Sequence, residues 1–388
     1  MDPCKKKEPE VSLQPARALY VHVPFCVSKC RYCDFYSLRH DIHGVTRYLQ
    51  AVRAEVRMRR SVLERPLRSL FLGGGTPTVL GPTALAELLD DLLPLTDSDT
   101  EISIEANPAS INADMLRTLA GRVNRINLGV QSFANAELST LGRVHDRQEA
   151  LEAWKRLRDI CPGNMGLDLI YGIPGQSLHS WQESVSTALG LWPDHISAYS
   201  LSFERGTPLE ADLQAGKLHE ISEDLQEQCY RHLIDAARRA GLEHYEISNF
   251  AAEDKQCVHN LTYWHNLPYV GVGPAAAGYV HGVRRTNLPD LNAWAAALRA
   301  GREPAAETEK LPPRLSAAET LMLGLRLRRG VNRREFAGRF GRDPVEMFPR
   351  SFDKFRDHLC LDATSIRLRE SALFVADTIL AEIISEAG

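Results

Sequence analysis

Three cysteines lie close together on one short stretch of the chain, at positions 26, 30 and 33. The spacing C-x3-C-x2-C allows each thiolate to bind one iron of a four-iron cluster, which leaves the fourth iron open to a small molecule. A tetrahedral zinc site is the alternative, and His22 or His40 would then supply the fourth ligand. The spacing and the flanking residues favour a [4Fe-4S] cluster on Cys26, Cys30 and Cys33.

Five later segments accompany this loop, and Tyr32 directly precedes its third cysteine. The segments are Phe71-Leu-Gly-Gly-Gly-Thr76-Pro, Ile104-Glu105-Ala-Asn-Pro, Asn127-Leu-Gly-Val-Gln131-Ser-Phe, Leu167-Asp168-Leu-Ile-Tyr-Gly-Ile-Pro-Gly175 and Tyr245-Glu-Ile-Ser-Asn-Phe-Ala251. Their order resembles the radical S-adenosylmethionine (SAM) superfamily, in the branch related to oxygen-independent coproporphyrinogen III oxidase. The resemblance begins near Tyr20 and runs to the C-terminus. It implies SAM as a second cofactor, with reductive cleavage of the SAM sulfonium as the chemistry that the cluster would supply.

The glycine run at positions 73–75, followed by Thr76, lets the backbone approach a ligand closely. The alternative is a plain strand-to-helix turn, which is common for glycine runs. Basic, acidic and amide side chains suit a zwitterionic nucleoside, because they can pair with its carboxylate, its amino group and its ribose hydroxyls. Taken singly, such residues are usually solvated surface groups. The resemblance implies SAM contacts from Tyr20, Tyr32, Gly74, Gly75, Thr76, Glu105, Gln131, Arg143 and Asp168.

A further segment, Cys257-Val-His259-Asn-Leu-Thr-Tyr263-Trp264, resembles the H-N-x-x-Y-W motif of haem chaperones of the HemW type. The resemblance implies that haem is carried as cargo. His259 would then be an axial ligand for the haem iron, while Tyr263 and Trp264 would offer flat apolar surface to the porphyrin. The alternative is a β-hairpin whose Tyr and Trp fill a core and whose His is only hydrogen bonded.

Phe35 occupies a position that separates two functions within this branch. Relatives that decarboxylate coproporphyrinogen typically carry a fourth cysteine there, two positions after the third, and a longer N-terminal region. The resemblance therefore implies a haem chaperone that transfers haem to an acceptor apo-protein, whose identity the sequence leaves open. An oxygen-independent coproporphyrinogen III oxidase, a radical-SAM oxidative decarboxylase, is the competing function. A zinc-stabilised binding module is a third, and no side chain is assigned as a catalytic residue.

The composition is that of an ordinary globular chain, with 25% charged and 44% hydrophobic residues over 388 positions. This length exceeds the size at which one core stops growing, so two or more domains are expected. A formal net charge of -4 argues against a general nucleic-acid binder. Clustered cysteines that must stay reduced favour a reducing compartment, and no apolar run has the length of a membrane span. We therefore expect a cytoplasmic protein with no integral membrane segment and no nucleic-acid partner.

Short apolar strands alternate with amphipathic helices from position 18 onward. Strands are expected over residues 19–23, 69–72, 101–104, 125–128, 166–170 and 195–200, and apolar helix faces around residues 45–56, 82–92 and 154–160. About six strand–helix units in a row predict the α/β class with a parallel sheet, arranged as a partial (β/α)6 radical-SAM barrel. Such a barrel brings the cysteine loop, the glycines, Glu105, Gln131 and Asp168 to one mouth, at the C-terminal ends of its strands.

The chain is expected to divide into five parts. These are a disordered tail at residues 1–17, the barrel core at 18–240, an extension with the H-N-x-x-Y-W segment at 241–300, a linker at 301–313 and a C-terminal domain at 314–388. Helices over 317–327, 333–340 and 344–359, followed by short strands at 366–368 and 373–375, predict a winged-helix-like α+β fold for that domain. Acidic residues are interspersed with its basic ones, so a lid or docking role over the barrel mouth is favoured over DNA binding.

Overall fold

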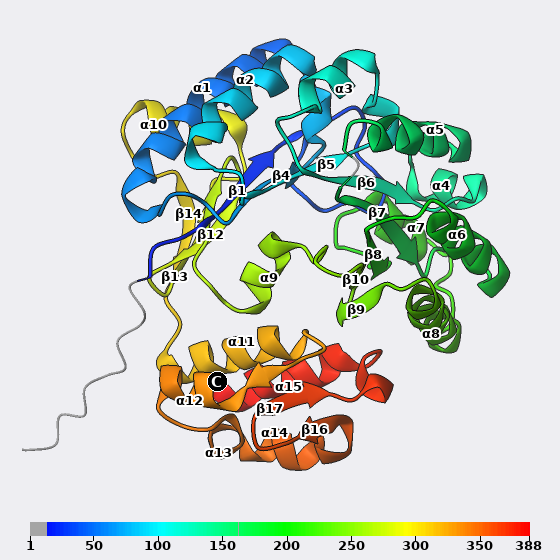
Figure 1. Ribbon diagram of the computed structural model, residues 1–388, viewed down its shortest axis with the longest axis vertical. Helices are drawn as coiled ribbons and strands as arrows, with labels where there is room; N and C mark the ends of the chain where they lie inside the picture. Colours follow the sequence, from blue (N-terminus) through cyan, green and yellow to red (C-terminus); the bar gives the residue numbers. More distant parts are fainter. Residues whose placement is uncertain (1–13, 162) are drawn as a thin grey trace, which may run out of the picture.

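One curved nine-stranded sheet dominates the computed structural model, which describes residues 14–161 and 163–388 (Figure 1). Its six central strands are parallel and follow one another in chain order, as the sequence predicts. In spatial order the strands are β11 (Val270–Val272), β1 (Ala18–Val23), β4 (Ser69–Gly74), β5 (Glu101–Ala106), β6 (Arg125–Gln131), β7 (Met165–Tyr171), β8 (His195–Ser200), β10 (Asn249–Ala251) and β9 (Glu243–Glu246). Within the described part of the chain, β11 and β9 do not pair with each other. The sheet is therefore an open arch, and the predicted partial barrel is confirmed.

Side chains along each strand alternate between the two faces of the sheet, and the outer face is apolar. Leu19, Val21 and Val23 of β1 are fully buried in the core, whereas Tyr20 and His22 point to the opposite face. Helices cover the outer face, as a parallel sheet requires (Figure 1). They are α1 (Ile42–Met58), α2 (Pro82–Leu92), α3 (Ala113–Leu119), α5 (Arg147–Arg158), α6 (Leu178–Gly190) and α8 (Glu223–Arg239), with α10 (Leu291–Arg299) packed on α1. None of the helices in the described residues is long and apolar enough to cross a membrane.

Helix α9 (Val258–Trp264) lies inside the arch and carries the H-N-x-x-Y-W segment (Figure 1). The backbone N–H groups of Val258 and His259 donate to the carboxylate of Glu101, at 3.0 and 3.2 Å. A carboxylate at a helix N-terminus satisfies N–H groups that have no partner within the helix. The segment is therefore a helix and not the β-hairpin of the alternative, because a buried acid of β5 starts a helix there, but its histidine is hydrogen bonded as that alternative expected.

Two predicted boundaries differ from the structure. Part of the expected linker forms β14 (Ala305–Glu309), the edge of a three-stranded antiparallel sheet with β13 (Val283–Asn287) and β12 (Ala277–Val280). An edge strand with mostly exposed side chains leaves no apolar pattern in the sequence. Residues 1–13 of the expected tail lie outside the described residues, but Ala16 is buried and its N–H donates to the carbonyl of Val62 at 2.9 Å. The folded chain therefore includes residues before position 18.

The C-terminal domain packs helices around a small antiparallel sheet, so its predicted α+β class is confirmed. Its elements are α11 (Pro313–Leu325), β15 (Val331–Asn332), α12 (Arg333–Phe340), α13 (Pro344–Met347), α14 (Pro349–Lys354), β16 (Leu359–Leu361), β17 (Ser365–Leu368) and α15 (Ala376–Ala387). The helix expected over 344–359 breaks at Phe348, whose φ is -128°, because Pro349 disfavours helical backbone at the residue before it. The prediction of a strand at 373–375 is wrong, because these residues form a bend and a turn. The partners of β17 are β15 and β16 instead.

Backbone hydrogen bonds attach the C-terminal domain to the edge of the large sheet. The N–H of Arg328 donates to the carbonyl of Tyr245 at 3.0 Å, and the N–H of Ile247 donates to the carbonyl of Arg326 at 3.1 Å. The hydrophobic core continues from the arch into this domain. The domain therefore lies against β9 and α9, on the open side of the arch (Figure 1).

Candidate functional site

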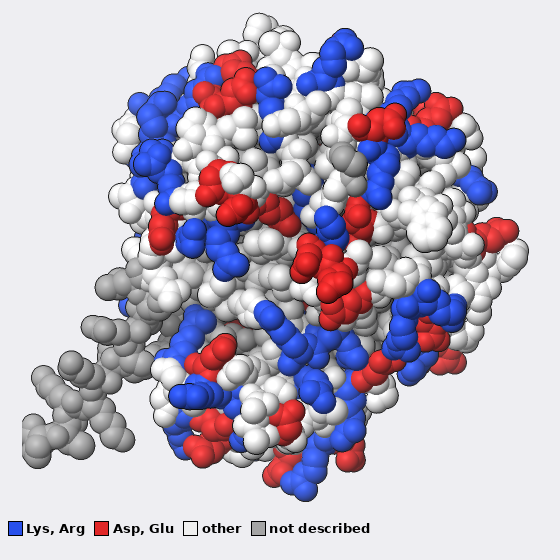
Figure 2. Space-filling model, in the orientation of Figure 1, with Lys and Arg blue, Asp and Glu red and all other residues white. Residues whose placement is uncertain are grey.

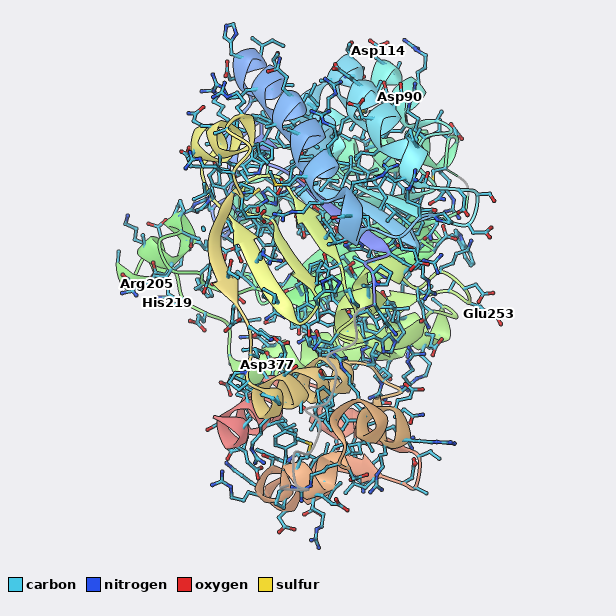
Figure 3. The ribbon with its side chains drawn as sticks, turned by 90° about the vertical axis from the view of Figure 1, so that its left-hand side faces the viewer. Asp90, Asp114, Arg205, His219, Glu253 and Asp377 are labelled. Carbon is cyan, nitrogen blue, oxygen red and sulfur yellow. The ribbon has the colours of Figure 1, made fainter. Side chains whose placement is uncertain are left out.

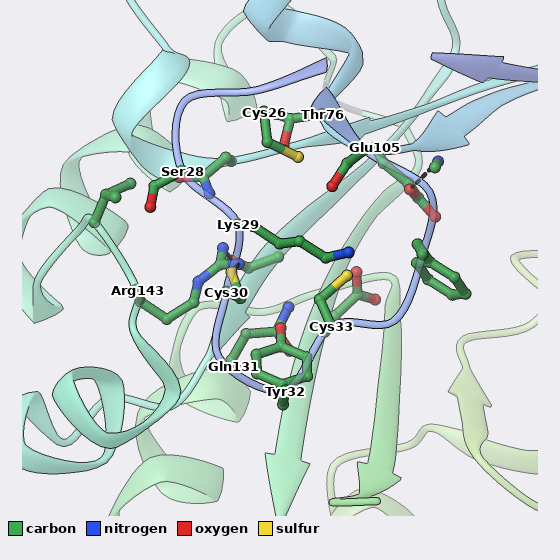
Figure 4. Close-up of a pocket in the computed structure, with 18 of the residues that line it drawn as sticks. Cys26, Ser28, Lys29, Cys30, Tyr32, Cys33, Thr76, Glu105, Gln131 and Arg143 are labelled. Carbon is green, nitrogen blue, oxygen red and sulfur yellow. Dashed lines mark hydrogen bonds between the residues drawn. The ribbon is translucent and has the colours of Figure 1, made fainter. Parts of the chain in front are cut away.

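The C-terminal ends of the parallel strands surround a cavity of about 470 Å³, which we call the mouth cavity (Figure 4). All three loop cysteines line it, together with eight of the nine residues predicted to contact SAM. These eight are Tyr32, Gly74, Gly75, Thr76, Glu105, Gln131, Arg143 and Asp168. Only the parallel sheet brings these distant segments together. Among the described residues, none from the C-terminal domain lines the cavity, so the expected lid over the mouth is wrong.

The cysteine loop joins two short strands, β2 (Phe25–Cys26) and β3 (Leu38–Arg39), and Arg31 anchors its centre. The N–H of Arg31 donates to the carbonyl of Leu141 at 3.0 Å, and its carbonyl accepts from the N–H of Leu209 at 2.9 Å. These partners belong to the short helices α4 (Asn135–Leu141) and α7 (Pro208–Gln214). The loop is thus held from two sides, which keeps its thiols around the cavity.

The three loop thiols are half-buried and free of disulfides. Burial raises the pKa of Cys26, although hydrogen bonds with Thr76 and Ser37 act in the opposite sense. Burial also raises the pKa of Cys33. Without metal these two thiols therefore favour their protonated form, and binding iron would release their protons.

Arg143 faces the loop across the mouth cavity. Its Nη1 donates to Sγ of Cys30 at 3.2 Å, and its Nη2 donates to the carbonyl of Gly129 at 2.6 Å. Gly142, with a left-handed φ of 71°, ends α4 and turns the chain into this position. The guanidinium therefore holds a positive charge against the centre of the cysteine loop.

The glycine run packs against the start of the cysteine loop. The N–H groups of Gly75 and Thr76 donate to the carbonyls of Val23 and Phe25, each at 2.8 Å. A Cβ atom on Gly75 would lie 2.6 Å from the carbonyl oxygen of Phe25, and Gly74 has a φ of 103°, so both positions require glycine. The run therefore holds the cysteine loop as a tight turn and lines the cavity at the same time.

Two acids, Glu105 and Asp168, share the inner wall of the mouth cavity. Glu105 accepts a hydrogen bond from the N–H of Gly74 at 3.1 Å, and Asp168 accepts one from Nδ2 of Asn127 at 3.2 Å. Burial and the charge of Asp168 raise the pKa of Glu105 to about 8. Burial also raises the pKa of Asp168, against hydrogen bonds from Ser197 and Asn127. A cationic ligand suits this wall, because its charge would relieve the repulsion between the acids.

Gln131 reaches the cavity from an irregular end of β6. Its φ of 73° lies in the left-handed region, which residues other than glycine rarely adopt. The pairing of β6 with β7 shifts register between Gly129 and Gln131. Such irregularities re-aim side chains and are common beside functional sites.

Sequence reasoning missed Lys29, Asn107, Tyr199 and Ser200, which also line the mouth cavity. Figure 4 shows Lys29 reaching across it from the cysteine loop. Tyr199 and Ser200 end β8, so the rule that places a site at the ends of barrel strands could have found them. Lys29 and Asn107 lie in loops and carry no comparable pattern.

The donor set suits a four-iron cluster better than a single metal ion. Among the described residues, no group of three or more His, Cys, Asp or Glu side chains is arranged to hold one ion. A four-iron cluster needs no such convergence, because each cysteine binds a different iron. Neither His22 nor His40 lines the mouth cavity, and the His22 nitrogens contact the Tyr20 hydroxyl at 3.0 Å and the Tyr36 carbonyl at 2.9 Å. The zinc alternative therefore lacks its fourth ligand.

Tyr20, His259 and Tyr263 do not line the mouth cavity but belong to an aromatic group deeper inside the arch. The His259 ring stacks on Phe71, with centroids 5.1 Å apart. Its Nδ1 lies 2.8 Å from Oγ of Ser69, and its Nε2 lies 2.8 Å from the hydroxyl of Tyr263. Burial lowers the pKa of His259 to about 3, so the imidazole is neutral. Both nitrogens are occupied, and neither is free to bind haem iron in this conformation.

Trp264, the last residue of the motif, lies elsewhere. It lines a second cavity, of about 840 Å³, between α9 and the C-terminal domain, which we call the α9 groove. The guanidinium carbon of Arg326 lies 4.6 Å from the centroid of the Trp264 ring, within cation–π range. The structure therefore separates Trp264 from His259 and Tyr263, with which it was expected to bind haem.

Comparison with family models and solved structures agrees with this architecture. Residues 20–188 match the Radical SAM superfamily, and residues 311–375 match the HemN C-terminal domain. The radical SAM enzyme coproporphyrinogen III oxidase (HemN) from Escherichia coli superposes with a TM-score of 0.83 at 20% identity, over 97% of this chain and 92% of that chain. At this identity the likeness shows a shared fold.

Relatives with higher identity span most of the chain. The heme chaperone HemW of Bacillus subtilis is 36% identical over 340 residues, which cover 86% of this chain and 89% of that protein. The heme chaperone HemW of Mycobacterium tuberculosis is 38% identical over 323 residues, covering 81% and 82%. The mitochondrial radical S-adenosyl methionine domain-containing protein 1 of Danio rerio is 33% identical over 328 residues, covering 81% and 73%. With these relatives, a radical-SAM arch and a three-cysteine loop, the chain belongs to the HemW family of the radical SAM superfamily.

Proposed function

We propose that this chain is a haem chaperone, which binds haem and transfers it to an acceptor apo-protein. The proposal extends to this chain what the names of its HemW relatives state for them. One observation on this chain supports the proposal independently of those names. Phe35, which is 61% exposed and lines the mouth cavity, stands where decarboxylating relatives have a further cysteine. The loop thus offers three thiols to the cavity and an apolar ring at the fourth position.

We further propose that the three loop cysteines hold a [4Fe-4S] cluster and that the mouth cavity binds SAM. The cluster, when bound, would supply an electron and an open iron for SAM. The side chains of the protein would supply charged groups and hold the two ligands in place. Arg143 keeps a cation beside Cys30, while Glu105 and Asp168 offer acids to the amino group and the ribose hydroxyls. The remaining walls are formed by Tyr32, Gly74, Gly75, Thr76 and Gln131.

Tyr20 supports this site without lining it. Its hydroxyl lies 3.0 Å from Nδ1 of His22. The His22 ring lies against Gly74, where an added Cβ atom would come within 2.4 Å of it. We therefore assign Tyr20 to positioning the glycine run in place of contacting SAM.

The free thiols indicate the kind of cellular compartment in which the protein would act. Iron binding needs reduced cysteines, so a reducing compartment is required and the cytoplasm is the proposed location. The proposed partners are haem and an acceptor apo-protein, with no nucleic acid.

Coproporphyrinogen III oxidase activity is the competing function, because the fold is shared with that enzyme. The deciding experiment is anaerobic purification with cluster reconstitution, followed in parallel by haem titration and by a porphyrinogen turnover assay with reduced cluster and SAM. We expect roughly one haem per chain, release of that haem to an added apo-haem protein, and no decarboxylation. Turnover of coproporphyrinogen III by a protein that binds no haem would assign the enzyme function instead.

A further inference from the structure

Lys29 and Arg31 flank Cys30 on the cysteine loop, but their side chains lie in opposite directions. Arg31 does not line the mouth cavity, and its guanidinium pairs with Asp212 of α7. Lys29 lines the cavity, and Figure 4 shows its side chain reaching across toward Cys33. One basic side chain of the loop therefore anchors it from outside, and the other enters the site.

The Lys29 ammonium lacks a direct partner. Within residues 14–161 and 163–388, no hydrogen bond or ion pair joins it to another side chain. Its charge nevertheless acts on the loop, because burial raises the pKa of Cys33 and the charge of Lys29 opposes this shift. Most exposed lysines extend into solvent, away from the protein. The inward direction of Lys29 therefore needs an explanation.

The only other described basic side chain that lines the mouth cavity is Arg143. Both of its terminal nitrogens already donate hydrogen bonds, one of them to Sγ of Cys30 at 3.2 Å. Arg143 thus supplies a positive charge on the Cys30 side of the loop, and Lys29 supplies one on the Cys33 side. The third thiol, of Cys26, faces a neutral hydroxyl group.

Charge beside an iron–sulfur cluster changes the potential at which the cluster is reduced. A nearby cation favours the reduced form, which carries one electron more than the oxidised form. Three acids line the same cavity, and their charges oppose reduction: Asp34, Glu105 and Asp168. Water weakens all of these interactions, because its high dielectric constant screens them. A ligand that fills the cavity displaces this water, so the influence of Lys29 should then increase.

We propose that Lys29 tunes the iron–sulfur cluster, with its ammonium beside the Cys33 side of the cluster, where it raises the midpoint potential for uptake of one electron. This inference rests on the proposed function, since it assumes a cluster on the three loop cysteines. Lys29 places a charge and does not ligate iron, so the cluster should assemble without it. An arginine at this position would keep the charge on a long side chain.

The test is a redox titration of the reconstituted full-length protein, with dithionite as the reductant and the EPR signal of the reduced cluster as the readout. Lys29→Met removes the charge and retains a long side chain. At the wild-type midpoint, we expect its ratio of reduced to oxidised cluster to fall roughly tenfold, which is a shift of about 59 mV for one electron. Lys29→Arg should restore most of the wild-type potential. Added SAM should enlarge the difference between wild type and Lys29→Met, because it displaces screening water.

Lys155→Met is the matched control. Lys155 is exposed on α5 and does not line the mouth cavity. Figure 2 shows basic and acidic side chains side by side over α5, on the outer surface of the molecule. Solvent and counter-ions screen a charge at such a place, so the midpoint potential should stay at its wild-type value. Iron and sulfide content should be near normal in all three variants, so that a shift reports charge and not loss of cluster.

The outcomes separate the inference from the proposed function. If the wild-type chain assembles no cluster, the proposed cluster site fails. If the wild type assembles a cluster and Lys29→Met has the same midpoint potential, with and without SAM, only the role of Lys29 fails. Loss of iron in both Lys29→Met and Lys29→Arg would also overturn the inference, because the lysine would then be needed for cluster assembly.

Discussion

The mouth cavity and the α9 groove lie at opposite ends of one arch, and their construction differs. The mouth cavity is assembled from the ends of parallel strands and is lined by three thiols, three acids and one half-buried arginine. The α9 groove is formed by one helix face and a second domain, and it offers arginines, an imidazole and apolar side chains. Among the described residues, no side chain lines both.

This difference indicates a division of labour within the chain. Thiolates and a cation-binding wall suit a metal cluster and a sulfonium nucleoside, whereas guanidinium groups and apolar walls suit an organic anion. A chain that keeps the two sites apart can lose one ligand without losing the other. Variants that perturb one end of the arch at a time therefore test whether the two sites are independent.

The largest effect is expected when the three loop cysteines are replaced together by alanine. The variant should lose nearly all of its iron and sulfide, because no other described group can hold a cluster in the mouth cavity. Haem affinity should stay within about twofold of wild type, since the H-N-x-x-Y-W segment, where the resemblance places haem, lines no part of the mouth cavity. Iron and sulfide analysis together with Soret titration measures both. A full complement of iron would remove the cluster from this loop, and a joint loss of haem would break the separation of the two sites.

The next effect concerns SAM. Asp168→Asn keeps the size of the side chain and removes its charge, so SAM affinity should fall roughly tenfold or more while iron content stays near normal. Equilibrium binding of labelled SAM to the reconstituted protein measures the change. Asp114→Asn, at an exposed site far from both cavities, is the control (Figure 3). An unchanged SAM affinity in Asp168→Asn would remove this acid from the site.

A smaller effect is expected from a matched pair of glycines. Gly142 and Gly121 have nearly equal φ values of 71° and 72°, so alanine at either position should lower stability by about 1–2 kcal/mol. An added Cβ on Gly142 would also come within 2.7 Å of Cγ of Arg31, whereas one on Gly121 would meet open space. Only Gly142→Ala should therefore reduce cluster occupancy, because it displaces the anchor of the cysteine loop. Equal iron content in the two variants would show that Arg31 does not position the thiols.

The smallest expected effect is a pH dependence at the inner wall of the mouth cavity. Folded Glu105 keeps its proton up to about pH 8, whereas the unfolded chain releases it near the ordinary pKa of 4.5. The folded state therefore binds more protons between these values, so this carboxyl makes stability fall as the pH rises from about 5 to 8. Glu105→Gln should raise the thermal midpoint of the metal-free protein by about 1–3 °C at pH 8.5 and leave it unchanged near pH 4. Glu253→Gln, at an exposed position, controls for loss of surface charge (Figure 3). A pH-independent difference would mean that Glu105 titrates normally.

Much of the mouth cavity could be predicted because its signals are local and its geometry is general. The cysteine spacing lies within eight positions, and each strand shows its own short apolar pattern. Parallel strands with outer helices must then bring their C-terminal ends to one side. Tyr20 was predicted to contact SAM, but it does not line the mouth cavity. A strand pattern does not show how close to the end of the arch a side chain lies. Lys29 was missed because a loop residue carries no periodicity.

The cysteine loop, the six parallel strands and the family can all be predicted from local patterns, since each depends on residues near one another or on motif order. The orientation of α9, in contrast, depends on tertiary contacts. Glu101, on β5, binds the backbone N–H groups of Val258 and His259 from more than 150 positions away, and this long-range contact turns His259 into the arch. The same contact leaves His265 facing the C-terminal domain, whose own position depends on backbone bonds from Arg326 and Arg328 to the edge of the sheet. Long-range hydrogen bonds of this kind leave no trace in local patterns, so only the folded chain shows which histidine meets the groove.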